Sequence, residues 1–318
     1  MNYSQQSHRN MINIIVEHHF KELPKKISRI TIGICNEVYR IALDDREIII
    51  RLSSTDKYLR GSEIHIPEFK QLGIKVPELL ASDYNQTLIP LCYQIQSKIE
   101  GQDLGIVIES LNHTELLGLA REIATIFRKV KTLPVTTQFG VIWGGDNDVS
   151  DSWSARMKLW IQESIEHGRL TGIMNQQFER IAKDVYRDYE AYFDSIKPSM
   201  YYGDICSKNV MIHQGVFNGL VDLDGLTQGD PLEALSRIKL SWYGTSHGEF
   251  YYNALIKELE LTQSEQQLII VYALLNQLSW MCENGIQFNQ NTKPIVSWEK
   301  AEADKNILLQ LVSALNIK

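Results

Sequence analysis

The sequence predicts a two-lobed α+β protein with a small β-rich N-terminal lobe and a larger, mainly helical C-terminal lobe. Strand-like runs concentrate in the first hundred residues, whereas helical periodicity dominates after about residue 105. A short β-rich island at 199–224 interrupts the helical part. With 318 residues, 44% of them hydrophobic, the chain can bury a substantial core without a disulfide or metal.

The N-terminal part begins with helical spacing at 11–20, and strand-like runs follow at 27–33, 37–44, 46–53 and 88–99. The runs on either side of 43–46 predict a β-hairpin. The stretch 57–73 has helical character, and we expect Pro67 to interrupt or kink it because proline lacks an amide hydrogen.

The C-terminal part has apolar residues at helical spacing in five stretches: 113–133, 154–168, 176–196, 265–285 and 299–317. We therefore expect an N-terminal lobe at 1–100 and a C-terminal lobe at 101–318. The short stretch "IEGQD" is the natural connection, which puts the hinge at about 97–102.

Composition and charge exclude several classes of function. Residues 1–100 hold 13 Lys+Arg and 12 Asp+Glu, and the remainder holds 19 and 27, so the larger part is acidic. This balance argues against a nucleic-acid partner and is compatible with a cationic small substrate. The four cysteines have no C-x-x-C spacing, and no signal peptide or membrane span is recognisable. We expect a cytoplasmic protein with reduced thiols, without a membrane partner.

The most informative stretch is "YYGDICSKNV", residues 201–210, which is followed by "VDLDG". Asp204, Asn209 and Asp222 each lie beside a run of β-formers. They could form a polar turn between strands or a metal-assisted phosphoryl-transfer site. Such a site needs a carboxylate to accept the proton of the attacking hydroxyl, and oxygen ligands to hold Mg²⁺ against nucleotide phosphates. Asp and Asn supply both.

The segment "GDICSKNVMI…GLVDLDGLTQGDPLEAL" resembles the aminoglycoside phosphotransferase and choline kinase family, whose usual form is H-G-D-x-x-x-x-N, a hydrophobic strand, then I-D and G-D-P. The resemblance covers roughly residues 27–245. It implies a protein-kinase-like fold, with Asp204 as catalytic base and Asn209 and Asp222 as Mg²⁺ ligands. Tyr202 stands where the family has His.

The resemblance also assigns nucleotide-binding positions in the N-terminal lobe. Gly33 and Asn36 match the loop that covers the phosphates, although a single Gly between strands is by itself a weak signal. Arg51 stands where most relatives have the Lys that binds the α- and β-phosphates; the hygromycin B phosphotransferase branch resembles this chain in having Arg. Its partner is expected on the following helix, with Glu63 preferred and Glu68 as the competitor.

The strand leading to the hinge completes the nucleotide site implied by the resemblance. Gln96 would occupy the gatekeeper position, and backbone groups of Ser97 and Ile99 would bind the purine. Because backbone groups leave no side-chain signature, the choice between ATP and GTP stays open.

The resemblance implies a kinase that transfers the γ-phosphate of ATP or GTP to a hydroxyl of an aminoglycoside-type antibiotic, closest to the hygromycin B branch. Alternatives are a kinase of choline, homoserine or a macrolide, or a nucleotide-binding pseudokinase. A polycationic substrate would need several carboxylates near Asp204; the candidates are Asp146, Asp148, Asp151, Glu163, Glu166, Glu249 and Glu283. We expect a monomer or weak dimer.

Overall fold

The N-terminal lobe is built on one five-stranded antiparallel sheet in the order β1-β2-β3-β5-β4. A computed structural model describes residues 4–145, 147–289 and 291–315. The strands are β1 (Lys26–Ile30), β2 (Glu37–Ala42), β3 (Glu47–Ser53), β4 (Leu79–Asp83) and β5 (Cys92–Ser97). The predicted hairpin is confirmed, because β2 pairs with β3 and Ala42 lies opposite Glu47.

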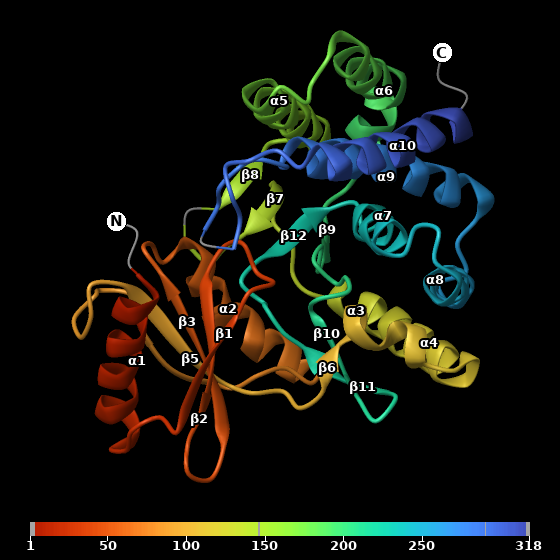
Figure 1. The fold of residues 1–318 in the computed structure, drawn as a ribbon. Helices are drawn as coiled ribbons and strands as arrows, with labels where there is room; N and C mark the ends of the chain where they lie inside the picture. Colours follow the sequence, from red (N-terminus) through yellow and green to blue (C-terminus); the bar gives the residue numbers. More distant parts are fainter. Residues whose placement is uncertain (1–3, 146, 290, 316–318) are drawn as a thin grey trace.

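Two helices flank this sheet (Figure 1). In α1 (Gln5–Phe20), the N-cap Ser4 accepts a hydrogen bond from the amide of Ser7. The apolar face of α1, with Ile12 and Ile15, joins Ile41 and Ile50 of the sheet in a core of its own. The second helix, α2 (Lys57–Gln71), instead contributes residues to the core of the C-terminal lobe. The two lobes are therefore packed together through α2.

The sequence predicts that Pro67 interrupts or kinks the helix, and the interruption does not occur. Helix α2 continues through Pro67, and its one non-helical residue is Tyr58, near the start (φ −94°, ψ 21°). The side chain of Ile66 is buried beside the proline, as is that of Phe69. Tertiary packing of this face offsets the hydrogen bond that proline cannot donate.

The C-terminal lobe is mainly helical, as predicted. Its helices are α3 (Leu104–Val107), the 3₁₀ turn η1 (Ile108–Ser110), α4 (His113–Val130), α5 (Trp153–Thr171), α6 (Gln176–Ser195), α7 (Leu232–Ser241), α8 (Ser246–Glu258), α9 (Gln263–Cys282) and α10 (Trp298–Ala314). Capping boxes begin α4 at Asn112 and α9 at Thr262. No helix of the described residues is long and apolar enough to cross a membrane.

Two small sheets position the loops that lie between the two lobes. One has the order β11-β10-β6, and the other has the order β8-β7-β12-β9. Their strands are β6 (Gln102–Asp103), β7 (Phe139–Ile142), β8 (Asp148–Ser150), β9 (Ser199–Tyr201), β10 (Val210–His213), β11 (Val216–Leu220) and β12 (Leu226–Gly229). The predicted island at 199–224 therefore splits between two sheets, because β9 and β10 join different partners.

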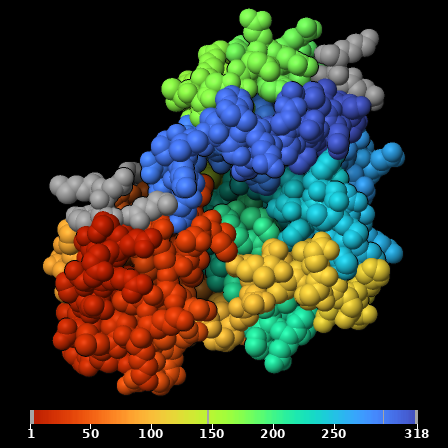
Figure 2. All heavy atoms as spheres, in the orientation of Figure 1, coloured from red at the N-terminus to blue at the C-terminus, as the bar shows by residue number. Residues whose placement is uncertain are grey.

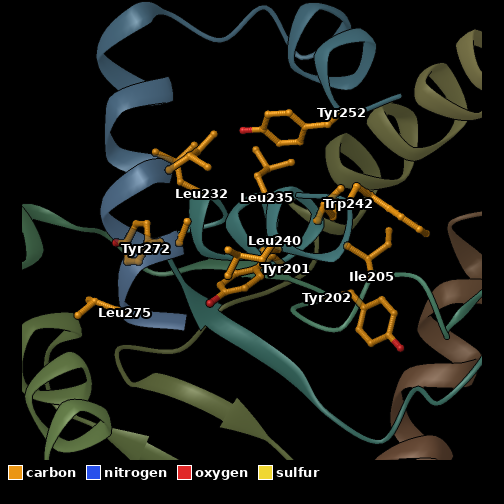
Figure 3. Packing of buried hydrophobic residues seen from close by; sticks show 14 of the residues in the cluster. Tyr201, Tyr202, Ile205, Leu232, Leu235, Leu240, Trp242, Tyr252, Tyr272 and Leu275 are labelled. Atoms are coloured by element: carbon orange, nitrogen blue, oxygen red, sulfur yellow. The ribbon is translucent and has the colours of Figure 1, made fainter. Parts of the chain in front are cut away.

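Aromatic side chains organise the core beneath these sheets (Figure 3). The indole of Trp153 donates to the hydroxyl of Tyr272 (2.8 Å), which donates to Asp230 (2.8 Å). A Cβ on Gly229 would lie 2.3 Å from the Trp153 ring. Packing therefore explains the residue types of the G-D-P segment at 229–231. The glycine leaves room for the indole of Trp153, and the carboxylate accepts hydrogen bonds from buried hydroxyls.

The lobes are in close contact where α2 meets the chain after β11. A Cβ built on Gly61 would lie 1.5 Å from the carbonyl oxygen of Asp224. Only glycine fits here, so the interior glycine of α2 has a packing role that outweighs its weak helix propensity.

We predict that Gly61→Ala destabilises the protein by about 1–3 kcal/mol, because the new methyl must displace the backbone at Asp224. Gly118→Ala is the matched control, since Gly118 is also interior to a helix but has open space around it. The control substitution should instead raise the free energy of unfolding, by at most about 1 kcal/mol. Denaturant unfolding measures both changes. Equal effects of the two substitutions would contradict the close packing of Gly61.

Candidate active site

The loop at 202–209 connects β9 to β10 and is the one that the sequence predicts to be the catalytic loop; hydrogen bonds within the loop shape it. Asn209 donates through its side-chain amide to the Asp204 carboxylate (2.6 Å) and to the Asp204 carbonyl (3.0 Å). These bonds orient Asp204 and leave the amide oxygen of Asn209 without a hydrogen bond among the described residues. The predicted pair therefore lies together, with one carboxylate and one amide oxygen presented for chemistry.

Tyr202 stands where the resemblance to the family predicts a His, and it contacts the segment that follows β11. Its ring is buried, and its hydroxyl lies within hydrogen-bond distance of the carbonyls of Val221 (2.9 Å) and Asp222 (3.1 Å). Burial raises the pKa of Tyr202 well above its ordinary value, so the hydroxyl stays protonated as a donor. Tyr202 thereby joins the catalytic loop to the segment that contains Asp222.

Asp222 follows β11 in the left-handed region of backbone space (φ 64°). The amide of Val221 donates to the carbonyl of Asn209 (3.0 Å), which keeps the segment beside the catalytic loop. Such a conformation is uncommon for a residue other than glycine and is often found at functional sites. The three residues singled out from the sequence therefore meet at one place.

Arg51 reaches this place from β3. Its guanidinium binds both carboxylate oxygens of Asp224, at 2.8 Å on one side and by a shorter contact on the other, and donates to Asp222 at 2.6 Å. The side chains of Arg51 and Asp224 are 5% and 6% exposed. Burial opposes the charge on Arg51, but the two carboxylates outweigh burial and raise its pKa. Burial raises the pKa of Asp224 to about 6, with Arg51 opposing that rise.

A chain of buried polar groups continues from this ion pair into the N-terminal lobe. The hydroxyl of Ser62 donates to Asp224 (2.5 Å). Gln96, the expected gatekeeper, donates to the Ser62 oxygen (3.4 Å) and to the side chain of Gln94 (3.1 Å). Gln96 thus helps to hold Arg51 in place indirectly, through Ser62 and Asp224.

The expected pairing of Arg51 with Glu63 is corrected by this geometry. Glu63 is exposed and accepts a hydrogen bond from Ser82 (2.8 Å), and Glu68 lies 3.0 Å from His65. Consecutive helical residues point in different directions, so the face of α2 that meets Asp224 presents Gly61 and Ser62 instead. The acidic partner of Arg51 comes from the other lobe.

The hinge backbone fits the sequence expectation only in part. The amide of Ser97 donates to the carbonyl of Glu78 (2.9 Å), which removes it as a free donor to a purine. Extension of the β4–β5 pairing is the physical reason. The backbone of Ile99, just beyond β5, makes no hydrogen bond among the residues that the structure describes. Purine binding by Ile99 stays a prediction.

The loop with Gly33 and Asn36 contacts the C-terminal lobe. Asn291 donates to the carbonyl of Gly33 (2.5 Å), and Asn289 donates to the carbonyls of Gly33 and Asn36 (both 3.2 Å). The connection between α9 and α10 thus reaches across to the loop. Figure 2 shows this region, in blue, meeting the N-terminal lobe, in red, above a hollow between the lobes. No pattern in the sequence indicates this contact.

The residues present fit a magnesium ion. Asn209 keeps a free amide oxygen, and Asp222 contributes a half-exposed carboxylate, and Mg²⁺ prefers such oxygen ligands together with phosphate oxygens. Arg51 donates to one oxygen of Asp222, which leaves the other oxygen available to a metal ion. Among the described residues, no group of three or more His, Cys, Asp or Glu side chains is arranged to hold an ion.

Most of the carboxylates considered for a cationic substrate are engaged or on the surface. Asp148 pairs with Arg156 (2.9 Å), and Glu249 accepts from the amide of Gly244 (3.2 Å). Asp146 lies outside the described residues, and the exposed group comprises Asp151, Glu163 and Glu166. Glu283 is half-buried, and burial raises its pKa.

Two cations near Asp204 were missed by the sequence analysis. Lys208 lies 3.3 Å from the Asp204 carboxylate, and its side chain is 32% exposed. Arg237 on α7 is held one helical turn from Glu233, at 2.6 Å. Lys208 stands in the quoted catalytic stretch and could have been noticed there. Arg237 could not, because only the packing of α7 brings it to the site.

Comparisons with known proteins show the family and the fold of the chain. The sequence model of the phosphotransferase enzyme family, APH, matches residues 26–266. No curated protein sequence matches the chain. Among solved structures, a thermostable mutant of the aminoglycoside phosphotransferase APH(4)-Ia is similar at 14% identity, with a TM-score of 0.72 over 95% of this chain and 98% of that one.

Two further structures are similar to the chain. A GDP complex of an aminoglycoside 2'-phosphotransferase-IIIa mutant matches at 12% identity and TM-score 0.69, over 96% of this chain and 98% of that one. The streptomycin–ATP–APH(2")-IIa complex matches at 11% identity and TM-score 0.65, over 98% and 97%. At these identities the likeness shows the kinase-like fold, which confirms the predicted fold class.

We predict that Cys206→Ser leaves turnover unchanged within about twofold, because the thiol only donates weakly to Asp204 (3.4 Å) and burial raises its pKa to about 12. Steady-state kinetics measures this. Thiol labelling at neutral pH should be slow at Cys206 for the same reason. Loss of turnover in the serine variant would indicate a direct chemical role for the sulfur.

We predict that Asp224→Asn raises the nucleotide KM about tenfold or more, because a charge-assisted hydrogen bond that positions Arg51 is lost. Glu63→Gln is the matched control, since it removes the same charge from the position first expected to pair with Arg51. Its KM should stay unchanged. A larger effect of Glu63→Gln than of Asp224→Asn would restore the original assignment.

Proposed function

The chain belongs to the phosphotransferase enzyme family, and from this premise we propose that it is a small-molecule kinase that transfers the γ-phosphate of ATP or GTP to a hydroxyl. One observation supports this most strongly. Asp204 is oriented by Asn209, and Tyr202 joins their loop to Asp222, so the carboxylates and amide that phosphoryl transfer needs lie at one place.

In the proposed reaction the acceptor oxygen forms a bond to the γ-phosphorus. The bond between this phosphorus and the β–γ bridging oxygen breaks, and the nucleoside diphosphate leaves. The proton of the acceptor hydroxyl passes to the carboxylate of Asp204. Asn209 contributes by orienting this carboxylate and takes no part in the proton transfer.

Arg51 would bind the nucleotide phosphates while Asp224 holds its guanidinium in the fork geometry. Its bond to Asp222 would be exchanged for one to a phosphate oxygen, which releases Asp222. Asn209 and Asp222 would then hold Mg²⁺. The ion supplies charge neutralisation at the phosphate oxygens. Asn289 and Asn291 donate to the carbonyls of Gly33 and Asn36. These hydrogen bonds would keep the loop that covers the phosphates in place.

We propose two classes of acceptor. Structures of the neighbours hold hygromycin B, streptomycin or kanamycin, which makes an aminoglycoside-type antibiotic the first acceptor class to examine. A second class, another small metabolite, is favoured by a specific observation. Lys208 pairs with Asp204, and the charge of Arg237 also interacts with it, where a polycation would need carboxylates. Membership in the hygromycin B branch stays a prediction.

We predict that Asp204→Ala lowers acceptor-dependent turnover by about 10²- to 10⁴-fold, because the proton acceptor is lost. A coupled nucleotide-turnover screen against aminoglycosides, macrolides, choline and amino-alcohols identifies the acceptor, and calorimetry measures nucleotide affinity, which should stay within about twofold. The control Asp188→Ala removes an exposed carboxylate that pairs with Arg187. Wild-type turnover in Asp204→Ala would overturn the mechanism. Nucleotide binding without turnover in the native protein would indicate a pseudokinase.

A further inference from the structure

The charges beside Asp204 carry an inference about the acceptor, which rests on the proposed kinase activity. We propose that the acceptor carries an anionic group, a carboxylate or a phosphate, close to its reacting hydroxyl, and that Arg237 binds this group. The shared chemistry is a planar set of anionic oxygens, which suits a guanidinium fork.

The position of Arg237 follows from the packing of α7 under the catalytic loop. Glu233, one turn earlier, is buried and accepts from the hydroxyl of Tyr201 (3.1 Å). A Cβ on Gly203 would lie 3.6 Å from the Glu233 carboxylate. Residues four apart share a helix face, so Arg237 emerges on the face of α7 that meets Gly203, and its charge interacts with that of Asp204.

Glu233 orients the guanidinium without consuming its binding capacity. The Nε atom of Arg237 donates to Glu233 (2.6 Å), and this is the one hydrogen bond of the Arg237 side chain among the described residues. Its two terminal nitrogens therefore keep their donors. The side chain is 31% exposed, so these donors are accessible. Burial opposes the charge on Arg237, but Glu233 and Asp204 raise its pKa and keep it charged.

The remaining charges favour an acceptor with an anionic group. Lys208 lies 3.3 Å from Asp204 and is 32% exposed, so cations flank the proposed base. Burial raises the pKa of the half-buried carboxylate Glu283, and the charges of Arg237, Lys300 and Lys208 oppose that rise. Each cation pairs with one carboxylate, Lys208 with Asp204 and Arg237 with Glu233, but both keep further donors that an anionic group could use and that would repel a cation placed beside them.

Binding at Arg237 would place the acceptor for reaction. An anion held beside Asp204 leaves a neighbouring hydroxyl of the same molecule within reach of this carboxylate. Because the anionic group does not change during phosphoryl transfer, Arg237 should contribute equally to substrate and transition-state binding. Its loss should therefore raise the acceptor KM more than it lowers kcat.

The first experiment uses matched pairs of acceptors that differ by the anionic group. The carboxylate pairs are L-serine with ethanolamine and L-homoserine with 3-amino-1-propanol. The phosphate pair is glycerol 3-phosphate with glycerol, and kanamycin and hygromycin B represent polycations. We expect nucleotide turnover with at least one anionic acceptor and none with its partner or with the polycations. The member that reacts distinguishes carboxylate from phosphate.

Two outcomes of this screen would overturn the proposal. One is turnover with an acceptor that lacks an anionic group. The other is no turnover with any anionic acceptor while slow nucleotide hydrolysis that depends on Asp204 persists. Absence of any Asp204-dependent hydrolysis or nucleotide binding would instead count against the kinase activity itself, so the two failures are distinguishable.

The second experiment tests Arg237 directly. Arg237→Gln should raise the acceptor KM about 10- to 100-fold, with the nucleotide KM unchanged and partial rescue in Arg237→Lys. Because Arg237→Gln leaves Glu233 buried without its partner, the double variant Glu233→Gln/Arg237→Gln tests the same effect without that charge. Arg180→Gln, which breaks an exposed Arg–Asp pair on α6, is the control. An unchanged acceptor KM in the folded double variant would overturn the role of Arg237.

Discussion

The buried ion pair between Arg51 and Asp224 is the interaction on which the site depends. Removing a guanidinium and a carboxylate from water costs several kcal/mol per ion, and a buried pair is tolerable only with close geometry and additional hydrogen bonds. Here both carboxylate oxygens are bound, and Ser62 adds a third donor. Since Arg51 belongs to the β-rich lobe and Asp224 to the chain after β11, this pair also sets the position of one lobe against the other.

The same pair explains how one cation can serve two partners. Asp224 is held on both oxygens, whereas Asp222 accepts a single bond from Arg51 and is 39% exposed. The contact that has the single bond and the more exposed carboxylate is the one that a phosphate can more easily replace. The hydroxyl of Tyr202 lies within hydrogen-bond distance of the Val221 and Asp222 carbonyls, so its one proton bonds to the backbone of this segment and not to the Asp222 carboxylate.

Local patterns made the fold and the catalytic loop predictable from the sequence. The spacing of Asp204 and Asn209 is short, and the hairpin between β2 and β3 is a contact between neighbours in the chain. The partner of Arg51 was not predictable in this way. Glu63 lies on the expected helix, but the approach of Gly61 to Asp224 turns another face of that helix to the arginine. Strands β7 and β12 were missed for a similar reason, since they are four residues each and pair across a long separation.

The charge of a lobe is a poor guide to the charge of its site. The acidic balance after residue 100 suggested a cationic substrate, yet most of its carboxylates lie on the surface, where water and salt screen them within about 8–10 Å. What an acceptor meets is the set of groups within that distance of Asp204. Packing of α7 beneath the catalytic loop puts Arg237 in that set, and the loop itself adds Lys208. Tertiary packing and not composition therefore determines which sign of charge the acceptor must carry.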